Sequence, residues 1–162
     1  MKTVFHSWEG EAVTEDRVEA QREIKAAPEK VFGVLCDPKG HVAIDSSGML
    51  QSAEGEPVKD TGDAFVVHMD REALGDMPLG KYDVTVTITE FERDAHIEWT
   101  VAEGGLDHRY GYRLEPTETG TRVTSYCDWS RTGEQYRSVL TFPVVPQISL
   151  RATLGILART VE

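Results

Sequence analysis

The 162-residue sequence contains no asparagine, only two cysteines and no long apolar run. Without asparagine there is neither an N-glycosylation acceptor nor a Cys-His-Asn catalytic set. Cys36 and Cys127 form no C-x-x-C motif, so we expect two reduced thiols and no metal site built on them. No segment approaches the roughly 20 apolar residues of a membrane helix, and residues 1–9 lack the apolar stretch of a signal peptide. We therefore expect a cytoplasmic protein without membrane insertion.

Basic residues are also scarce, with 17 Lys and Arg against 28 Asp and Glu and a net charge of −11. Nucleic acids and anionic membranes bind through concentrated positive charge, so we expect neither as a partner. The length suits one domain with its own core. No G-x-S-x-G motif points to a hydrolase, and the pattern gives no indication of an oligomeric state.

Alternating apolar and polar residues predict a series of half-buried strands. The first is Val18–Ala26, followed by a short helix that begins at Pro28 and a second one around Gly40–Asp45. Residues 1–17 show no pattern, so we interpret them as an N-terminal arm or a short extra strand and place the folded domain at 18–162. Six more strands are expected at residues 49–53, 64–70, 82–91, 95–101, 108–115 and 121–129.

The period changes after Pro143 and Pro146. Apolar residues then recur at steps of four, three and four, which predicts an amphipathic helix with one apolar stripe, formed by Leu150, Leu154, Leu157 and Val161. An antiparallel sheet with one apolar face needs a cover, and this helix is long enough to provide it. The order therefore predicts an α+β domain, with an antiparallel meander covered by a C-terminal helix.

Several local strings resemble the SRPBCC superfamily, the START, birch-pollen-allergen and polyketide-cyclase-like proteins of helix-grip fold. The strings are residues 24–38, 61–65, 112–116 with 120–123, and 150–154. The resemblance implies a curved sheet of about six or seven strands around the long helix. It also implies a cavity that takes a hydrophobic small molecule, lipid-like or polyketide-like, without a cofactor.

The inward strand positions are rich in aromatic and amphipathic side chains, which are typical of a small-molecule pocket. The alternative is that these residues only fill the core between sheet and helix. We predict that the ligand contacts a set of residues from the strands and the C-terminal helix: Phe65, Val67, Met69, Val84, Val86, Trp99, Tyr110, Tyr112, Cys127, Trp129, Leu150 and Leu154.

His108 is a candidate for proton chemistry, because it shares a strand face with Tyr110 and Tyr112. These three would be the acid/base groups if the protein were an enzyme of the polyketide cyclase/dehydratase type. The alternative places His108 on the surface beside Asp107 and Arg109. A third possibility is an interaction module like the chaperone-activator branch of the superfamily, with a closed cavity and an exposed apolar patch.

Arg22 interrupts the apolar face of the first strand, where it would either hold a ligand carboxylate or extend to the rim. His68 with Asp70, and His96 with Glu98, form pairs of possible metal ligands. A strand separates the two pairs by about 10 Å, so we expect no metal site.

Residues 75–81 have the spacing of a phosphate-binding loop, but Tyr82 follows in place of Ser or Thr and a strand follows in place of a helix. We therefore interpret this segment as a loop over the cavity mouth that carries Met77, Pro78 and Leu79. The connection 130–145 is expected to cover the other side with three apolar or aromatic side chains, Tyr136, Leu140 and Phe142.

Overall fold

The computed structural model describes residues 5–8, 11–13, 16–75, 78–101 and 106–162. Its strands are β1 (Phe5–Trp8), β2 (Glu11–Val13), β3 (Arg17–Ile24), β4 (Leu50–Glu54), β5 (Ala64–Asp70), β6 (Lys81–Glu92), β7 (His96–Val101), β8 (His108–Pro116) and β9 (Thr121–Asp128). Its helices are α1 (Pro28–Cys36), α2 (Pro38–Ile44), the short 3₁₀ turn η1 (Arg71–Ala73), α3 (Glu134–Arg137) and α4 (Gln147–Val161). The α+β order predicted from the sequence is confirmed.

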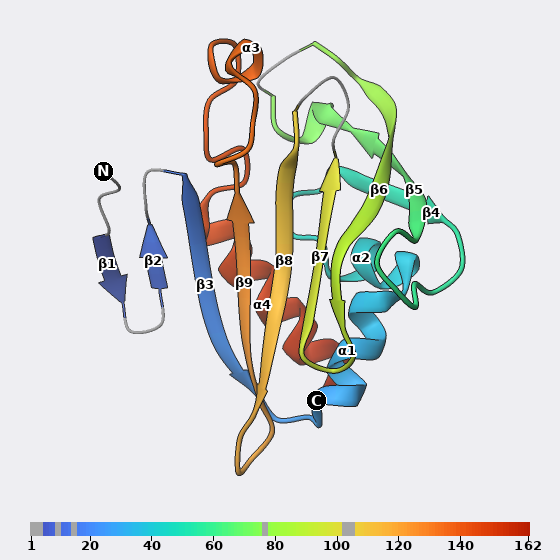
Figure 1. The fold of residues 1–162 in the computed structure, drawn as a ribbon, viewed down its shortest axis with the longest axis vertical. Helices are drawn as coiled ribbons and strands as arrows, with labels where there is room; N and C mark the ends of the chain where they lie inside the picture. Colours follow the sequence, from blue (N-terminus) through green and yellow to red (C-terminus); the bar gives the residue numbers. More distant parts are fainter. Residues whose placement is uncertain (1–4, 9–10, 14–15, 76–77, 102–105) are drawn as a thin grey trace.

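All described strands form one antiparallel sheet in the order β1-β2-β3-β9-β8-β7-β6-β5-β4. The strands from β4 to β9 follow one another as a meander, and β9 then pairs with β3 from the start of the domain. The helices α4, α1 and α2 lie on the same side of the sheet (Figure 1). The N-terminal segment, which we interpreted as an arm or a short extra strand, contributes β1 and β2 beside β3.

The two short helices begin where proline allows it. Pro28 opens α1 and Glu29 occupies its first turn, where a negative charge favours the unpaired N–H groups. The predicted start of the second helix at Gly40 was too late, because Pro38 opens α2. The Asp37 side chain accepts a hydrogen bond from the backbone N–H of Lys39 at 3.0 Å, which caps that helix.

The core lies between the sheet and α4. The predicted stripe of Leu150, Leu154, Leu157 and Val161 is buried, and the helix packs on β3 and β9. Facing it are inward residues of the sheet that are also buried: Val18, Ala20, Ile24, Leu114 and Val123. This packing fixes α4 against the sheet along its length.

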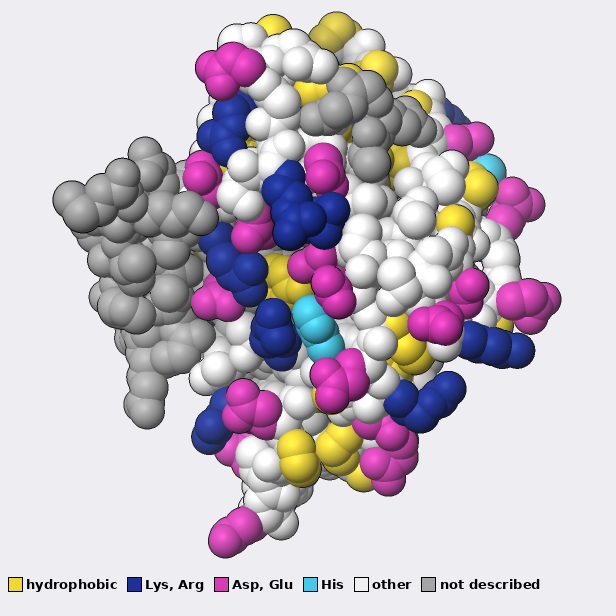
Figure 2. Space-filling model, viewed as in Figure 1, with side chains coloured by type: hydrophobic (Ala, Val, Ile, Leu, Met, Phe, Trp, Pro, Cys, Tyr) yellow, Lys and Arg dark blue, Asp and Glu magenta, His cyan; other side chains and the backbone are white. Residues whose placement is uncertain are grey.

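The outer face of the sheet carries charged side chains of both signs (Figure 2). At its centre Tyr126 is only 1% exposed, because its ring lies against Gly111, which has no side chain to displace it. The Tyr126 hydroxyl donates to the Glu98 carboxylate at 2.7 Å and lies 2.8 Å from Nε2 of His96. The Arg17 guanidinium lies over the ring, 4.0 Å from its centroid. This arrangement ties β3, β7, β8 and β9 together from outside.

Candidate functional site

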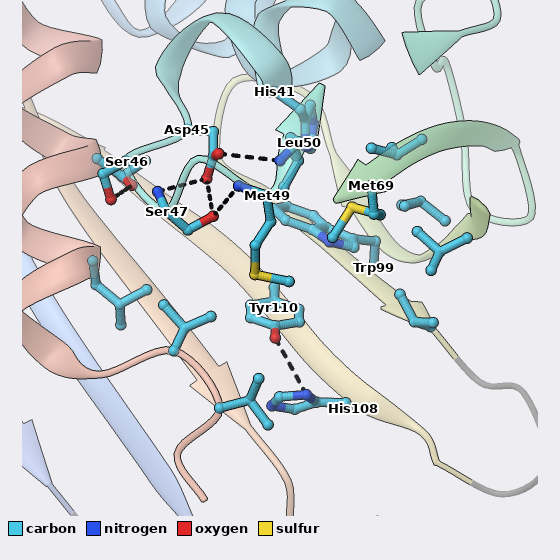
Figure 3. A pocket seen from close by; sticks show the side chains of 18 of the residues that line it. His41, Asp45, Ser46, Ser47, Met49, Leu50, Met69, Trp99, His108 and Tyr110 are labelled. Carbon is cyan, nitrogen blue, oxygen red and sulfur yellow. Dashed lines mark hydrogen bonds between the residues drawn. The ribbon is translucent and has the colours of Figure 1, made fainter. Parts of the chain in front are cut away.

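A cavity of about 400 Å³ lies on the concave face of the sheet. Its walls come from β5 to β8, from α2 and the turn after it, from α4, and from the connection between β9 and α4. Figure 3 shows side chains from these elements converging on the space. The sheet and the helices therefore enclose a volume that side chains do not fill.

Eight of the twelve residues predicted to contact a ligand line this cavity. They come from four strands and from α4: Val67, Met69, Val84, Val86, Trp99, Tyr110, Tyr112 and Leu150. Their alternation along each strand points them inward, as expected from the pleat of a half-buried sheet. The stacked Trp99 and Tyr110 rings, with centroids 6.1 Å apart, form a broad aromatic wall.

The other four predicted residues, Phe65, Cys127, Trp129 and Leu154, belong to the core and do not line the cavity. The three of them that come from the sheet region, Phe65, Cys127 and Trp129, each have a neighbouring side chain packed against them. Cys127 contacts His108, Trp129 stacks on Phe142 with centroids 5.7 Å apart, and Phe65 packs against the edge of His41. Alternation along a strand thus predicts which face a side chain is on, but not whether another side chain lies between it and the cavity.

His108 is buried at the cavity wall, with only 4% of its surface exposed, so the alternative of a surface histidine is wrong. Its Nδ1 lies 3.2 Å from the Tyr110 hydroxyl, a contact visible in Figure 3. Its Nε2 lies 2.9 Å from Sγ of Cys127. The three side chains share one face of β8 and β9, because Tyr110 and Cys127 are direct partners in the sheet.

Burial makes these groups neutral at physiological pH. It lowers the pKa of His108 to about 4, because a buried imidazolium loses its hydration. The same effect raises the pKa of the Cys127 thiol to about 12 and the pKa of the Tyr110 phenol well above its usual range. The set can therefore exchange hydrogen bonds with a ligand, but it holds neither a thiolate nor an imidazolium.

A turn between α2 and β4 builds one side of the cavity. The Asp45 carboxylate accepts hydrogen bonds from the backbone N–H groups of Ser47, Gly48 and Leu50 at 3.0, 2.9 and 3.3 Å, and from the Ser47 hydroxyl at 2.8 Å (Figure 3). The next serine, Ser46, connects the turn to α4 through its hydroxyl, which donates to the backbone carbonyl of Ser149 at 2.8 Å. These bonds fix the turn that follows α2.

His41 and Met49 also line the cavity and were missed by the sequence analysis. Met49 extends from the turn toward Tyr110 (Figure 3). His41 lies on α2 with its ring edge-on to Trp99. The seven residues of α2 are too few for a helical period to show which side faces inward, so His41 carried no usable signal.

The remaining candidates lie elsewhere. Arg22 is exposed and does not line the cavity. On the outer side of the sheet, His68 lies 2.6 Å from the Asp83 carboxylate and 3.1 Å from the Glu54 carboxylate. Within the described residues, no group of three or more His, Cys, Asp or Glu is arranged to hold a metal ion.

The loops near the cavity partly follow the expectation. Leu79, Tyr136 and Leu140 line the cavity, while Phe142 packs between Trp129 and His108. Met77 lies outside the described residues. No helix in the described part of the chain is both long and apolar enough to span a membrane.

The family model for polyketide cyclase/dehydrase and lipid transport proteins matches residues 15–162. The chain belongs to this family. The family is part of the SRPBCC superfamily, so the resemblance found in the sequence is confirmed. This polyketide cyclase/dehydrase-family protein therefore has a ligand-binding fold.

Among known proteins, the chain is similar to protein Rv0088 of Mycobacterium tuberculosis, with 29% identity over 119 residues. The match covers 72% of this chain and 49% of that protein, so it spans about half of the curated relative. Solved structures from Rhodobacter sphaeroides and Chromobacterium violaceum are similar at TM-scores of 0.64 and 0.61, with 16% and 18% identity. The first match covers 99% of this chain and 97% of the other, and the second covers 91% and 97%. These structural likenesses show the fold.

Proposed function

We propose that this protein binds an apolar or aromatic small molecule in the cavity between the sheet and α4. The observation that carries the proposal is the unfilled volume of about 400 Å³ behind a wall of aromatic and aliphatic side chains. Small-molecule sites have volumes of about 300–1,000 Å³ and combine apolar walls with a few polar groups. A protein that needed only a core would fill such a space, because interiors are close-packed.

The chemistry of the wall supports a ligand with an apolar body. Val67, Val84 and Val86 form an aliphatic strip on β5 and β6, and Leu50 at the start of the neighbouring β4 also lines the cavity. The polar groups Tyr110 and His108 on β8 are neutral, and the charged lining residues are Asp45, whose carboxylate is hydrogen-bonded within its turn, and Arg71 and Asp83 near the β5–β6 connection. A permanently charged body would lose its hydration in such a space without gaining a compensating partner over most of its surface.

The first test uses the wild-type protein. It is extracted with organic solvent, the extract is analysed by mass spectrometry, and the stripped protein is screened against lipids and aromatic polyketides by thermal shift. A compound present at 100 times its dissociation constant adds about 2.7 kcal/mol to the free energy of unfolding. The proposal fails if no compound co-purifies and none raises the melting temperature.

A pair of variants locates the site. Val84→Trp puts a large side chain into the cavity, whereas Val66→Trp puts the same side chain on the neighbouring strand, outside the residues that line the cavity. We expect Val84→Trp to lose the ligand-induced thermal shift and Val66→Trp to keep it. Equal loss in both variants, or no loss in either, would place the binding elsewhere.

We propose, as a second candidate, an enzyme of the cyclase/dehydratase type, favoured by the contact between His108 and Tyr110 at the cavity wall. The Tyr110 hydroxyl would donate to a ketone oxygen, while His108 would accept the proton of the adjacent carbon. The attacking carbon then forms a bond to the carbon of a second ketone, and the alkoxide produced there takes the proton back from His108. The resulting hydroxyl leaves as water together with the remaining proton of the attacking carbon, which forms a double bond. Mass spectrometry of a poly-β-ketone substrate would show loss of one water with wild type and none with Tyr110→Phe or His108→Phe. If the wild-type protein leaves the substrate unchanged, the enzyme proposal fails and the proposal of ligand binding remains.

The interaction-module alternative predicted a closed cavity and a large exposed apolar patch. The cavity is not filled by side chains. In the described residues, the large hydrophobic side chains that are exposed are Leu79, Val139 and Ile148. The first lies on the β5–β6 connection and the other two on the segment from α3 to α4. The structure therefore favours ligand binding over this alternative.

A further inference from the structure

His41 is a polar side chain enclosed at the cavity wall. It is 8% exposed and lies on α2 between that helix and the sheet. Its ring contacts Trp99 and Phe65 edge-to-face, with centroid distances of 4.7 and 5.2 Å. Rings from two strands therefore fix the plane of the imidazole, and His41 is one of the residues that line the cavity.

The hydrogen bond of His41 determines which ring nitrogen carries the proton. Nε2 lies 2.7 Å from the backbone carbonyl oxygen of Leu35 in the last turn of α1. A carbonyl oxygen only accepts hydrogen bonds, so Nε2 must carry the hydrogen. Burial also lowers the pKa of His41, so the ring is neutral. Nδ1 therefore has a lone pair and no hydrogen.

This lone pair has no partner among the described residues. Of the side-chain nitrogen and oxygen atoms in that part of the chain, the Thr132 hydroxyl is the one that is both fully enclosed and without a hydrogen bond. Nδ1 of His41 is consequently not sealed in the core, and the residue that carries it is part of the cavity wall. A ligand that covers Nδ1 without offering a donor would leave a buried acceptor unpaired, at a cost of about 1–3 kcal/mol, so the site is suited to a ligand that supplies a donor.

We propose that Nδ1 of His41 accepts a hydrogen bond from a hydroxyl group of the bound molecule. The inference rests on the proposed function and narrows its ligand to an alcohol or phenol on an apolar body. An ether or ester oxygen at the same place would set lone pair against lone pair. The Leu35 carbonyl prevents the ring from adapting, because reversing the proton would leave that carbonyl without its donor.

The test compares matched probes on the wild-type protein. Three pairs are used, each an alcohol and its methyl ether: 2-naphthol and 2-methoxynaphthalene, 9-hydroxyphenanthrene and its ether, and dodecanol and its ether. We expect at least one alcohol to bind roughly tenfold more tightly than its ether, as one buried hydrogen bond gives. His41→Phe keeps an aromatic ring, and in this variant the ratio falls to about one.

A matched control separates this effect from a general one. His68→Phe makes the same substitution on the outer side of the sheet, away from the cavity, and it should retain the tenfold preference. In case His41→Phe does not fold, nitrogen-15 NMR of the wild-type histidines gives a second readout. The His41 Nδ1 signal should have the position of an unprotonated ring nitrogen and move when an alcohol is added, but not when its ether is added.

The outcomes separate this inference from the function it rests on. If every alcohol and its ether bind equally, or if His41→Phe keeps the preference, the assignment to His41 is overturned and the binding function stands. A protonated Nδ1 in the NMR spectrum overturns the assignment as well. If no probe of either kind and no lipid or polyketide binds, the proposed function itself fails.

Discussion

The burial of His108 makes the stability of the protein dependent on pH. In the unfolded chain this histidine takes up a proton near pH 6.5, whereas in the folded chain its pKa is lowered to about 4. Between these values the unfolded state binds more protons, so stability falls as the pH falls through this window. The full difference of about 2.5 between the two pKa values corresponds to about 3 kcal/mol in the free energy of unfolding. Between pH 7 and pH 5 the free energy of unfolding falls by about 2 kcal/mol through this group.

The measurement is urea unfolding at 25 °C, followed by tryptophan fluorescence at pH 7 and pH 5, for wild type and His108→Gln. Other buried groups with lowered pKa values, such as His41, contribute equally to both proteins and cancel in the comparison. We expect the variant to lose about 2 kcal/mol less than wild type on acidification. An identical loss in the two proteins would refute the burial argument, and with it the neutral His108 at the cavity wall.

Three further substitutions test the packing by urea unfolding at pH 7. Leu157→Ala removes a fully buried side chain of α4 and should cost about 2–5 kcal/mol; a loss below 1 kcal/mol would contradict its core position. In Gly120→Ala, the new Cβ would lie 2.1 Å from the Ile24 carbonyl oxygen, so we expect a loss of about 1–3 kcal/mol, and unchanged stability would disprove the close approach of these strands. Tyr126→Phe removes the hydrogen bond to the Glu98 carboxylate and should cost about 1.5–3 kcal/mol; a neutral result would show that this outer-face bond adds no stability.

Much of the fold could be predicted because half-buried strands and helices carry different periods. The strand expected at residues 64–70 has these bounds in the structure, and the strand expected at 108–115 ends one residue later. The stripe of Leu150, Leu154, Leu157 and Val161 is buried on one side only if the segment forms a helix that packs against an apolar surface. Each of these signals repeats over several residues, which makes it robust to a single exception.

The site was less predictable, because alternation gives the direction of a side chain and not what lies in front of it. Tyr110 and Cys127 point the same way from neighbouring strands, yet the first lines the cavity and the second lies behind His108. Tyr126 points outward and is nevertheless buried, because Gly111 leaves room for its ring. Such outcomes depend on neighbours across the sheet, which a single strand sequence does not specify.

The pairing of β3 with β9 affects how the protein folds during its synthesis. Arg17 meets Asp128 and Ile24 meets Thr121, so strands separated by about a hundred residues must find each other. Chains dominated by such distant contacts fold slowly, on the scale of milliseconds to seconds. During synthesis, β3 leaves the ribosome long before β9 exists, and α4 follows later still. The edge of β3 that will meet β9 therefore stays unpaired, and the sheet and its cavity close only when the last quarter of the chain arrives.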